Sequence, residues 1–509
     1  EIPRIMASKR VLKRGINRTR AAENRRQLQD SLRKKDRLAM RDKRRRIAKE
    51  GHKAFTAEQG KAAIRAAIMG FREHRGDEGK QVECLNEISR ILSTDSYDPD
   101  VAIDHLIELK FVDDLISQLG GGTKSAELQL QAAWCITNIA SGTHQQTAHV
   151  AEACPELIQA LSGTNQKLKE HAVWALGNIA ADGKKLRNRI VKMGAFLPLS
   201  NLLQSKDVGL VRTTCWAISN MLKGRELTTS DEFYKHSFMK SFWGLLESKE
   251  STIYAEVCWC IAYLTSRDES GTAKIIEAGF AQRILSALDE KSPVALLIPA
   301  LRTMGNMLAY NDDFNQKVLS TCKHLLNFLA VCMKHEHRGL KKEAIWVVGN
   351  ILAGPKEHVE VVIKSGFLPV LLEIFQKGQF DLKREAIHAL LNVAKYDEPL
   401  EFMVKQGVIP PVLSLMKVDE RDTIAACIQF IEIILARNKD AVRLVEEAGG
   451  IDALETVQTH PDGSLWDRAG GIVDKYWGED ADYDDDEKET EKEKVEYPQW
   501  RLGAHTGES

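Results

Sequence analysis

Residues 172–183 read AVWALGNIAADG and place a bulky Trp174 and a polar Asn178 four residues apart in a stretch otherwise typical of a buried helix. Residues spaced by four lie on one face of an α-helix, so the two side chains are neighbours. The same pattern returns as QAAWCITNIASG, TTCWAISNMLKG, EVCWCIAYLTSR, ALRTMGNMLAYN, EAIWVVGNILAG and EAIHALLNVAKY. It therefore marks a repeated unit.

The first position of this pattern recurs every 40 to 44 residues. Such a period is typical of armadillo and HEAT proteins, in which units of two or three helices stack because none can bury its apolar face alone. With less regular units at either end, we expect about ten repeats. The sequence predicts an all-α, right-handed armadillo-repeat superhelical solenoid. The first positions are Trp134, Trp174, Trp216, Trp259, Arg302, Trp346 and His388.

Glycines recur with the same spacing, at or near the start of segments such as GAFLPLSNLL, SGFLPVLLEI and QGVIPPVLSL. A glycine turn that enters a helix, often with Pro198, Pro369 or Pro410 in the first turns, is the joint expected between short and long helices. The glycines are Gly194, Gly279, Gly366, Gly407 and Gly449.

Composition supports a large helical core, since 43% of the residues are hydrophobic and only 6% are aromatic. The sequence has no apolar run of 18 residues and no signal-peptide pattern, so we expect a soluble intracellular protein. The nine cysteines lack paired spacing. Most lie in apolar stretches, as Cys135, Cys215, Cys258 and Cys427 do, and we expect reduced core residues there.

Charge divides the chain into three predicted regions. Residues 1–53 form a basic arm, since residues 1–50 hold 19 Lys and Arg against 6 Asp and Glu; this arm is expected to be disordered or helical only on a partner. Residues 57–477 form the solenoid, and Thr56 followed by Gln59 predicts a capping box at its start. Residues 478–509 contain GEDADYDDDEKETEKEK and form an acidic, disordered tail.

Two interpretations of the recurring Trp and Asn positions compete. A single Trp is usually assigned to the core. However, Asn is a poor helix former that is costly to bury unpaired, and the second position is Asn or Tyr in every stretch. We therefore expect an exposed row, while Ala172, Val173, Leu176 and Ile179 supply the core side.

An exposed row of this kind suits an extended basic peptide. Stacked helices lie about 10 Å apart and a peptide advances about 3.3 Å per residue, so one repeat spans about three ligand residues. Asn amides can hold a peptide backbone whatever its sequence. Indoles leave slots for Lys or Arg stems, with cation–π attraction of about 0.5 to 2 kcal/mol per pair. Acids beside the row would select cations; these are Asp182, Glu256, Glu343 and Glu385.

These features resemble those of importin alpha, the family of nuclear import adaptors. The resemblance rests on WCITNIASGT followed by WALGNIAADG, the 40 to 44 residue step, the segment KRVLKRGINRTRAAENRRQLQDSLRKKDRLAMRDKRRRI, and the acidic end after IVDKYWGED. It covers nearly the full chain. It implies two sites for basic nuclear localisation signals, a major site on repeats 2 to 4 and a minor site on repeats 6 to 8.

The resemblance assigns residues to both sites by match of motif, with Asp182 taking the key lysine. His388 stands where the family has Trp, which replaces one wall of a slot with a smaller ring that could carry charge, so we expect a weaker or altered minor site. The major site would comprise Trp134, Asn138, Ser141, Gly142, Thr147, Trp174, Asn178, Asp182, Trp216 and Asn220. The minor site would comprise Glu256, Trp259, Arg302, Asn306, Glu343, Trp346, Asn350, Glu385 and Asn392.

By the same resemblance, the basic arm would bind importin beta and fold back into the groove as a mimic of cargo. Only about ten residues separate Arg46 from the expected start of the solenoid at Ala57, a tether of at most about 35 Å. The region 466–486 would bind an export receptor with its Ran GTPase; the alternative is a solvating cap. The resemblance implies shuttling between cytoplasm and nucleus. The arm residues assigned are Lys13, Arg14, Lys43, Arg44, Arg45 and Arg46.

Other functions remain as alternatives. An armadillo scaffold for signalling or adhesion would bind acidic partners and would need Lys and Arg along the row. Nucleic-acid binding through the arm fits its charge, but the acidic remainder of the chain would repel a duplex. Neither membrane binding nor a cofactor is expected. An enzyme is disfavoured, because phosphate-binding loops, nucleophile elbows and HExxH are lacking, and Cys332, His335 and His337 are too loosely spaced for a metal site.

Overall fold

The computed structural model describes residues 56–93, 98–120, 125–223, 232–267, 269–289, 291–418, 420–438 and 440–478. The predicted basic arm and all but the first residue of the predicted acidic tail lie outside these ranges. Backbone contacts divide the chain into two units at residues 287 and 288. We call the described residues up to 287 the N-terminal unit and those from 288 the C-terminal unit.

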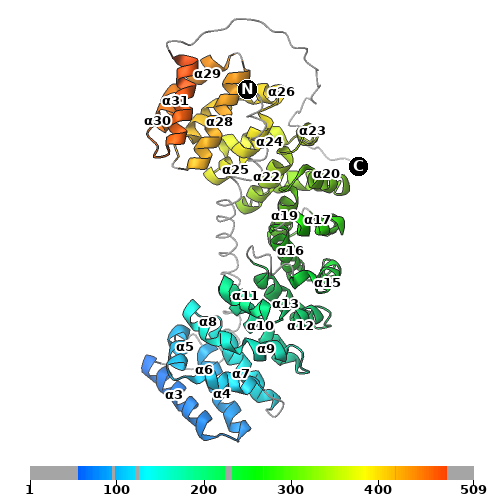
Figure 1. The fold of residues 1–509 in the computed structure, drawn as a ribbon, viewed down its shortest axis with the longest axis vertical. Helices are drawn as coiled ribbons and strands as arrows, with labels where there is room; N and C mark the ends of the chain where they lie inside the picture. Colours follow the sequence, from blue (N-terminus) through cyan, green and yellow to red (C-terminus); the bar gives the residue numbers. More distant parts are fainter. Residues whose placement is uncertain are drawn as a thin grey trace. The chain divides into compact units, whose positions relative to one another are not determined.

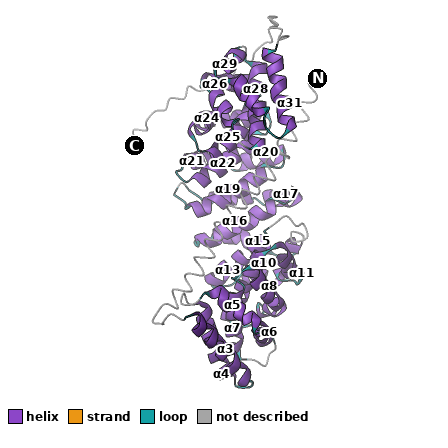
Figure 2. Ribbon diagram, turned by 90° about the vertical axis from the view of Figure 1, so that its left-hand side faces the viewer, coloured by secondary structure: helices purple, strands orange, loops and turns teal. Residues whose placement is uncertain are grey.

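The described residues form helices and no strands, and within each unit successive helices follow one another along a stack (Figures 1 and 2). The helices of the N-terminal unit are α3 (Ala57–Glu73), α4 (Glu78–Ser93), α5 (Pro99–Glu108), α6 (Phe111–Leu119), α7 (Ala126–Ile139), α8 (His144–Val150), the 3-10 helix η1 (Ala151–Ala153), α9 (Cys154–Ala160), α10 (Gln166–Asp182), α11 (Lys184–Lys192), α12 (Phe196–Leu202), α13 (Val208–Met221), α15 (Phe238–Leu245), α16 (Ser251–Thr265), α17 (Glu269–Glu277) and α18 (Phe280–Ser286).

The C-terminal unit continues the same alternation of helix lengths. Its helices are α19 (Val294–Leu308), α20 (Asp312–Thr321), α21 (Leu325–Lys334), α22 (Arg338–Leu352), α23 (Lys356–Lys364), α24 (Phe367–Lys377), α25 (Phe380–Val393), α26 (Asp397–Lys405), α27 (Ile409–Leu415), α28 (Arg421–Arg437), α29 (Ala441–Glu447), α30 (Gly450–Val457) and α31 (Gly463–Trp477).

The last helix of each repeat builds the stack. In the N-terminal unit α4, α7, α10, α13 and α16 each pack on the next, and in the C-terminal unit α19, α22, α25, α28 and α31 do the same. Such stacking buries apolar faces that a single repeat would leave in water. The predicted core side is confirmed, because Ala172, Val173, Leu176 and Ile179 are all fully buried. The described part of the chain therefore holds five last helices in each unit, as expected for about ten repeats.

The first described helix, α3, begins at the predicted capping box. Thr56 Oγ1 accepts a hydrogen bond from the backbone N–H of Gln59, and the Gln59 side chain accepts one from the backbone N–H of Thr56. These two bonds satisfy N–H groups that the first turn of a helix leaves without intrahelical partners. The predicted capping box is confirmed.

The recurring glycines adopt a backbone that other residues rarely take. Gly194, Gly279, Gly366, Gly407 and Gly449 all have φ between 75° and 84°, in the left-handed region. Each lies between the first and second helices of its repeat, so the long last helix follows one helix later than the sequence suggested. The prolines do fall in first turns, as Pro198 does in α12.

All nine cysteines are free thiols, and all except the half-buried Cys84 are buried. Burial raises the pKa of Cys135 and of Cys154 to about 12, so both stay protonated at neutral pH. The expectation of reduced core cysteines is confirmed at Cys135, Cys215, Cys258 and Cys427. Among the described helices, none is both long enough and apolar enough to span a lipid bilayer.

Gly407→Ala should lower the free energy of unfolding by about 1–2 kcal/mol, because a Cβ is strained in the left-handed region. The cost is backbone strain alone, since no atom lies within 4 Å of the added Cβ. The change in the free energy of unfolding is measured by urea denaturation of the full chain, with circular dichroism as the signal. Gly471→Ala is the matched control, because Gly471 lies in α31 with equally open space. Gly471→Ala should raise the free energy of unfolding by about 0.5–1 kcal/mol. Equal changes in this free energy for the two variants would show that the left-handed backbone at Gly407 is not the cause.

Candidate functional site

The Trp and Asn positions lie on the last helices of successive repeats. We call Trp134, Asn138, Trp174, Asn178, Trp216, Asn220 and Trp259, on α7, α10, α13 and α16, the N-terminal row. We call Arg302, Asn306, Trp346, Asn350, His388 and Asn392, on α19, α22 and α25, the C-terminal row.

The Asn side chains connect each last helix to the one before it. Asn178 Nδ2 donates to the carbonyl oxygen of Thr137 at 3.4 Å, and Asn220 Nδ2 donates to that of Gly177 at 3.2 Å. Each acceptor is the residue directly before the preceding Asn of the row. A buried amide that finds a carbonyl acceptor avoids the cost of desolvation without a partner.

The C-terminal row repeats this arrangement. Asn350 Nδ2 donates to the Gly305 carbonyl oxygen at 2.8 Å, and Asn392 Nδ2 donates to the Gly349 carbonyl oxygen at 3.2 Å. The acceptors again directly precede Asn306 and Asn350. The Asn positions therefore have a structural role in both units, as links between neighbouring repeats.

Two indoles cover glycines of the preceding last helix. A Cβ on Gly177 would lie 2.3 Å from Cζ3 of Trp216, and a Cβ on Gly305 would lie 1.9 Å from Cζ3 of Trp346. Only glycine leaves room for a ring at these distances. The rings are consequently shielded, and Trp216 and Trp346 are 8% and 9% exposed.

The expectation of a uniformly exposed row is wrong at five positions. Trp216, Trp346, Asn178 and Asn220 are buried, because the indoles pack on glycine and the amides bond to the neighbouring helix. Arg302 is buried as well, in its pair with Glu343. The other members are half-buried, with part of each side chain open to solvent: Trp134, Asn138, Trp174, Trp259, Asn306, Asn350, His388 and Asn392.

The start of the N-terminal row holds donors without acceptors. Within the described residues, no hydrogen-bond partner exists for Nε1 of Trp134 or for Nδ2 of Asn138. The indole of Trp134 stacks on the ring of His171, with centroids 5.7 Å apart and planes 22° apart. Unpaired buried donors are unusual in folded proteins, because burial removes their hydrogen bonds to water without a replacement.

Of the other residues assigned to the major site, Ser141 and Gly142 lie in the turn after α7 and Thr147 lies in α8. Ser141 Oγ donates to the Asn138 carbonyl oxygen at 2.7 Å, and Thr147 Oγ1 donates to that of Ala140 at 3.3 Å. A Cβ on Gly142 would meet Gln146 Oε1 at 2.1 Å, so glycine lets this turn close tightly. Ser141 is exposed, whereas Thr147 is buried and supports the turn from within.

The predicted acids of the N-terminal unit have partners. Asp182, the last residue of α10, accepts a hydrogen bond at 2.6 Å from Nδ1 of His144, the first residue of α8. Glu256 accepts one from Ser219 Oγ, also at 2.6 Å. His144 could not be predicted from the sequence, because nothing in the row pattern places it opposite a residue 38 positions away.

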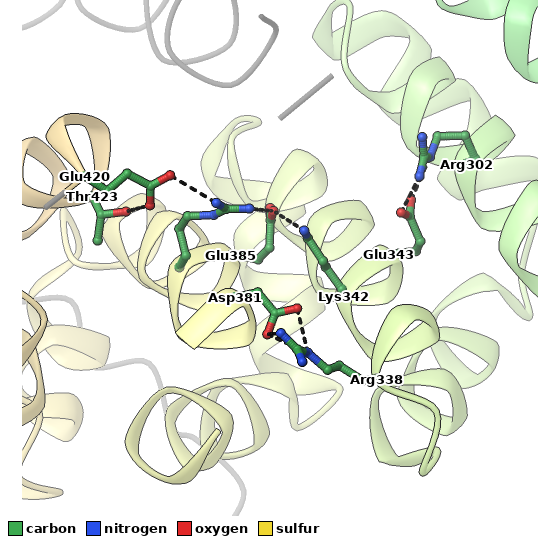
Figure 3. A network of polar contacts seen from close by, with 9 residues as sticks. Arg302, Arg338, Lys342, Glu343, Asp381, Glu385, Glu420 and Thr423 are labelled. Carbon is green, nitrogen blue, oxygen red and sulfur yellow. Dashed lines mark hydrogen bonds and ion pairs between the residues drawn. The ribbon is translucent and has the colours of Figure 1, made fainter. Parts of the chain in front are cut away.

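The acids of the C-terminal unit are already paired with cations (Figure 3). Arg302 Nε donates to Glu343 Oε2 at 2.8 Å, and Glu343 is only 2% exposed. Glu385 lies 3.9 Å from Lys342 Nζ and 3.6 Å from the guanidinium of Arg384. Buried carboxylates need such partners, because desolvation penalises an unpaired charge. In the state described, these acids are paired with cations of the chain itself, and the expectation that they select a ligand's cation stays a prediction.

Arg384 carries the C-terminal network onward, since its Nη1 donates to Glu420 at 3.1 Å (Figure 3). Burial lowers the pKa of the nearby His388, an effect that Glu385 partly opposes. His388 is accordingly neutral at neutral pH, which corrects the expectation that this ring could carry charge. The smaller ring also leaves Gly349 uncovered: an added Cβ would be 3.6 Å from the Cβ of Ala389.

At the end of the C-terminal unit, Trp466 is 46% exposed and its indole N–H donates to the His460 carbonyl oxygen. The rest of the region expected to bind an export receptor, from residue 479, lies outside the described residues. No group of three or more His, Cys, Asp or Glu in the described ranges is arranged to hold a metal ion.

The stacked helical repeats define an armadillo-repeat protein, and comparison with known proteins agrees. The armadillo/beta-catenin-like repeat model matches residues 143–181 and 184–223, and an atypical Arm repeat model matches residues 439–491. The chain is 30% identical over 455 residues to importin subunit alpha-9 of Arabidopsis thaliana, covering 86% of each chain. It is 31% identical over 456 residues to importin subunit alpha-2 of Oryza sativa subsp. japonica, covering 86% of this chain and 84% of the relative.

The chain therefore belongs to the importin alpha family, as the sequence resemblance indicated. A crystal structure of an engineered protein shares the fold, with a TM-score of 0.72 at 21% identity, covering 81% of this chain and 98% of that one. The fold prediction is confirmed.

Gly305→Ala should destabilise the protein by about 1–3 kcal/mol, because the new methyl group displaces the Trp346 ring. Gly349→Ala is the matched control in the same unit, since it precedes Asn350 as Gly305 precedes Asn306. It meets Ala389 at an ordinary contact distance and should be neutral or stabilising by up to about 1 kcal/mol. Urea midpoints of the full chain give both values, and a similar loss for both would contradict the role given to the indole.

Proposed function

We propose that this protein is a nuclear import adaptor whose N-terminal row binds basic nuclear localisation signals in an extended conformation. The observation that carries the proposal is the pair of half-buried indoles, Trp134 and Trp174, on neighbouring last helices of the unit that also holds the carboxylate of Asp182. A lysine offers both complements, since its aliphatic stem packs on an indole and its ammonium carries positive charge. The relatives named as importin alpha subunits support the same role.

The physical basis is spacing. The last helices α7 and α10 pack on each other, so the half-buried Trp134 and Trp174 lie one repeat apart. Neighbouring helices lie about 10 Å apart, which about three residues of an extended strand span. Lysine or arginine stems would lie along the exposed part of each ring, with a cation–π contribution of about 0.5 to 2 kcal/mol. The major site proposed is the set of residues that the family resemblance assigned.

We expect the C-terminal row to be the weaker site. Its acids Glu343 and Glu385 already have cationic partners, so a peptide's cation has to compete for them. His388 supplies a neutral imidazole where an indole would offer a larger surface. Removing one member of a buried ion pair strands the other, so this network resists rearrangement. Glu256 and Trp259, assigned to the minor site by resemblance, lie on α16 in the N-terminal unit. The proposal for the C-terminal row does not include them.

The basic arm is proposed to bind importin beta and, in its absence, to compete with cargo. Lys13 and Arg14 and the run at residues 43–46 are the groups assigned to these roles, and all lie outside the described residues. Tethering can raise the effective concentration of a competing segment to about the millimolar range, enough to rival a micromolar ligand. Binding to importin beta would remove the arm and free the groove.

The other partners follow from the same role. An export receptor with its Ran GTPase is proposed to bind at the C-terminal end around Trp466, and the protein would shuttle between cytoplasm and nucleus. The adaptor needs only binding surfaces, so no catalytic step, cofactor, membrane contact or direct nucleic-acid contact is part of the proposal.

Asp182→Lys should weaken binding of a labelled peptide containing Lys-Lys-Arg-Lys by at least about tenfold, because it replaces an attractive charge with a repulsive one. Glu277→Lys is the matched control: Glu277 also ends a helix of the N-terminal unit, and it is exposed on α17. Fluorescence anisotropy with the full chain at fixed salt measures both. Equal affinities for wild type and Asp182→Lys, or preference for an acidic peptide, would sink the proposal and favour a scaffold for acidic partners.

Deletion of residues 1–50 should raise the affinity for the same peptide severalfold, because the competing segment is lost. It should also abolish capture by immobilised importin beta. Replacing Lys43, Arg44, Arg45 and Arg46 with alanine in the full chain separates local competition from general charge effects, and Lys34→Ala with Lys35→Ala is its control within the arm. Unchanged peptide affinity after deletion would rule out autoinhibition.

A further inference from the structure

The carboxylate of Asp182 is shielded by an imidazole of the chain itself. His144 Nδ1 lies 2.6 Å from Asp182 Oδ2, and the side chains are 75% and 13% exposed respectively. The ring therefore stands on the solvent side of a largely buried carboxylate. A ligand that approaches from solvent meets His144 before it reaches the charge.

The position of Asp182 explains why this contact forms. Asp182 is the last residue of α10, where unpaired carbonyls make the helix end negative and a carboxylate is unfavourable. Such a carboxylate gains from any donor or cation nearby. Among the described residues, the side chain that hydrogen-bonds to it is His144, which the Thr143 and Gln146 capping box fixes at the start of α8.

The charged residues described on α5, which packs against α8, bond to groups other than Asp182. On α5, Asp104 accepts a hydrogen bond from Gln146, and His105 pairs with Glu108. The second histidine of α8, His149, is exposed and is not bonded to Asp182. The contact is thus specific to one of the two histidines of the same short helix.

We propose that His144 is a specificity-determining residue that competes with the ligand for Asp182 and so sets the affinity for lysine at that one position. The inference rests on the proposed function. An imidazole N–H that donates to Oδ2 occupies one of the two carboxylate oxygens to which a lysine ammonium donates at about 2.7–2.9 Å, so the ligand has to displace or share this bond. The cost falls only on the peptide residue that reaches Asp182.

The test uses the full chain and a labelled Gly-Gly-Lys-Lys-Arg-Lys-Gly-Gly peptide, with anisotropy measured at fixed salt and pH. His144→Ala should tighten binding about three- to tenfold, the range expected for removing a partly exposed hydrogen bond to a charged group. His144→Lys should weaken binding by a similar factor, because a permanent cation then pairs with Asp182. His149→Ala, the same change on the same helix, should leave the affinity unchanged.

Two further measurements separate competition from a merely structural effect. The gain from His144→Ala should vanish when Asp182 is replaced with asparagine in the same chain, and it should vanish for one of the peptides in which a single lysine is changed to alanine. A gain that persists in Asp182→Asn, or one that is equal for every peptide, overturns the proposal.

The Asp182→Asn and His144→Ala variants together separate the role of His144 from the proposed function. If Asp182→Asn weakens binding while His144→Ala leaves it unchanged or weaker, the lysine site stands and His144 is not a competitor. If Asp182→Asn has no effect, the proposed function fails and the inference fails with it.

Discussion

The hydrogen bond from four of the Asn amides to a carbonyl of the preceding last helix is the contact on which the register of the stack depends. It appears between α7 and α10, α10 and α13, α19 and α22, and α22 and α25, always to the residue before the previous Asn. Apolar packing between helices is not directional, and it would tolerate small slips along the axis. A polar bond at a fixed place removes that freedom, so each helix has one position on its neighbour.

The same residues explain why a binding surface can arise on this face. Asn needs a partner when buried, and the neighbouring helix supplies one for only part of its hydrogen-bonding capacity. At the start of the row, Asn138 has no such partner among the described residues. The amide chemistry that links the repeats is thus the chemistry proposed to hold a peptide backbone.

Much of the fold could be predicted from the sequence, because period, helix faces and glycine joints are local properties. The step of 40 to 44 residues, the core side of α10 and the left-handed glycines all follow from spacing and backbone chemistry. Exposure of the row could not be predicted in this way. Whether Trp216 faces water depends on Gly177 of the preceding repeat, and the partner of Asp182 is a histidine on the first helix of the same repeat. Neither contact is contained in the spacing of the row, which records positions on the last helices alone.

The short sequence separation of the contacts between last helices affects how the chain can fold during translation. The bonds between last helices join residues 41 to 45 positions apart, and the ion pair of Arg302 with Glu343 spans 41. Each therefore links one repeat to the next. When a repeat leaves the ribosome, the neighbour it docks on has already emerged, so these contacts can form in the order of translation. A nascent chain of this kind need not wait for its C-terminus before it begins to assemble.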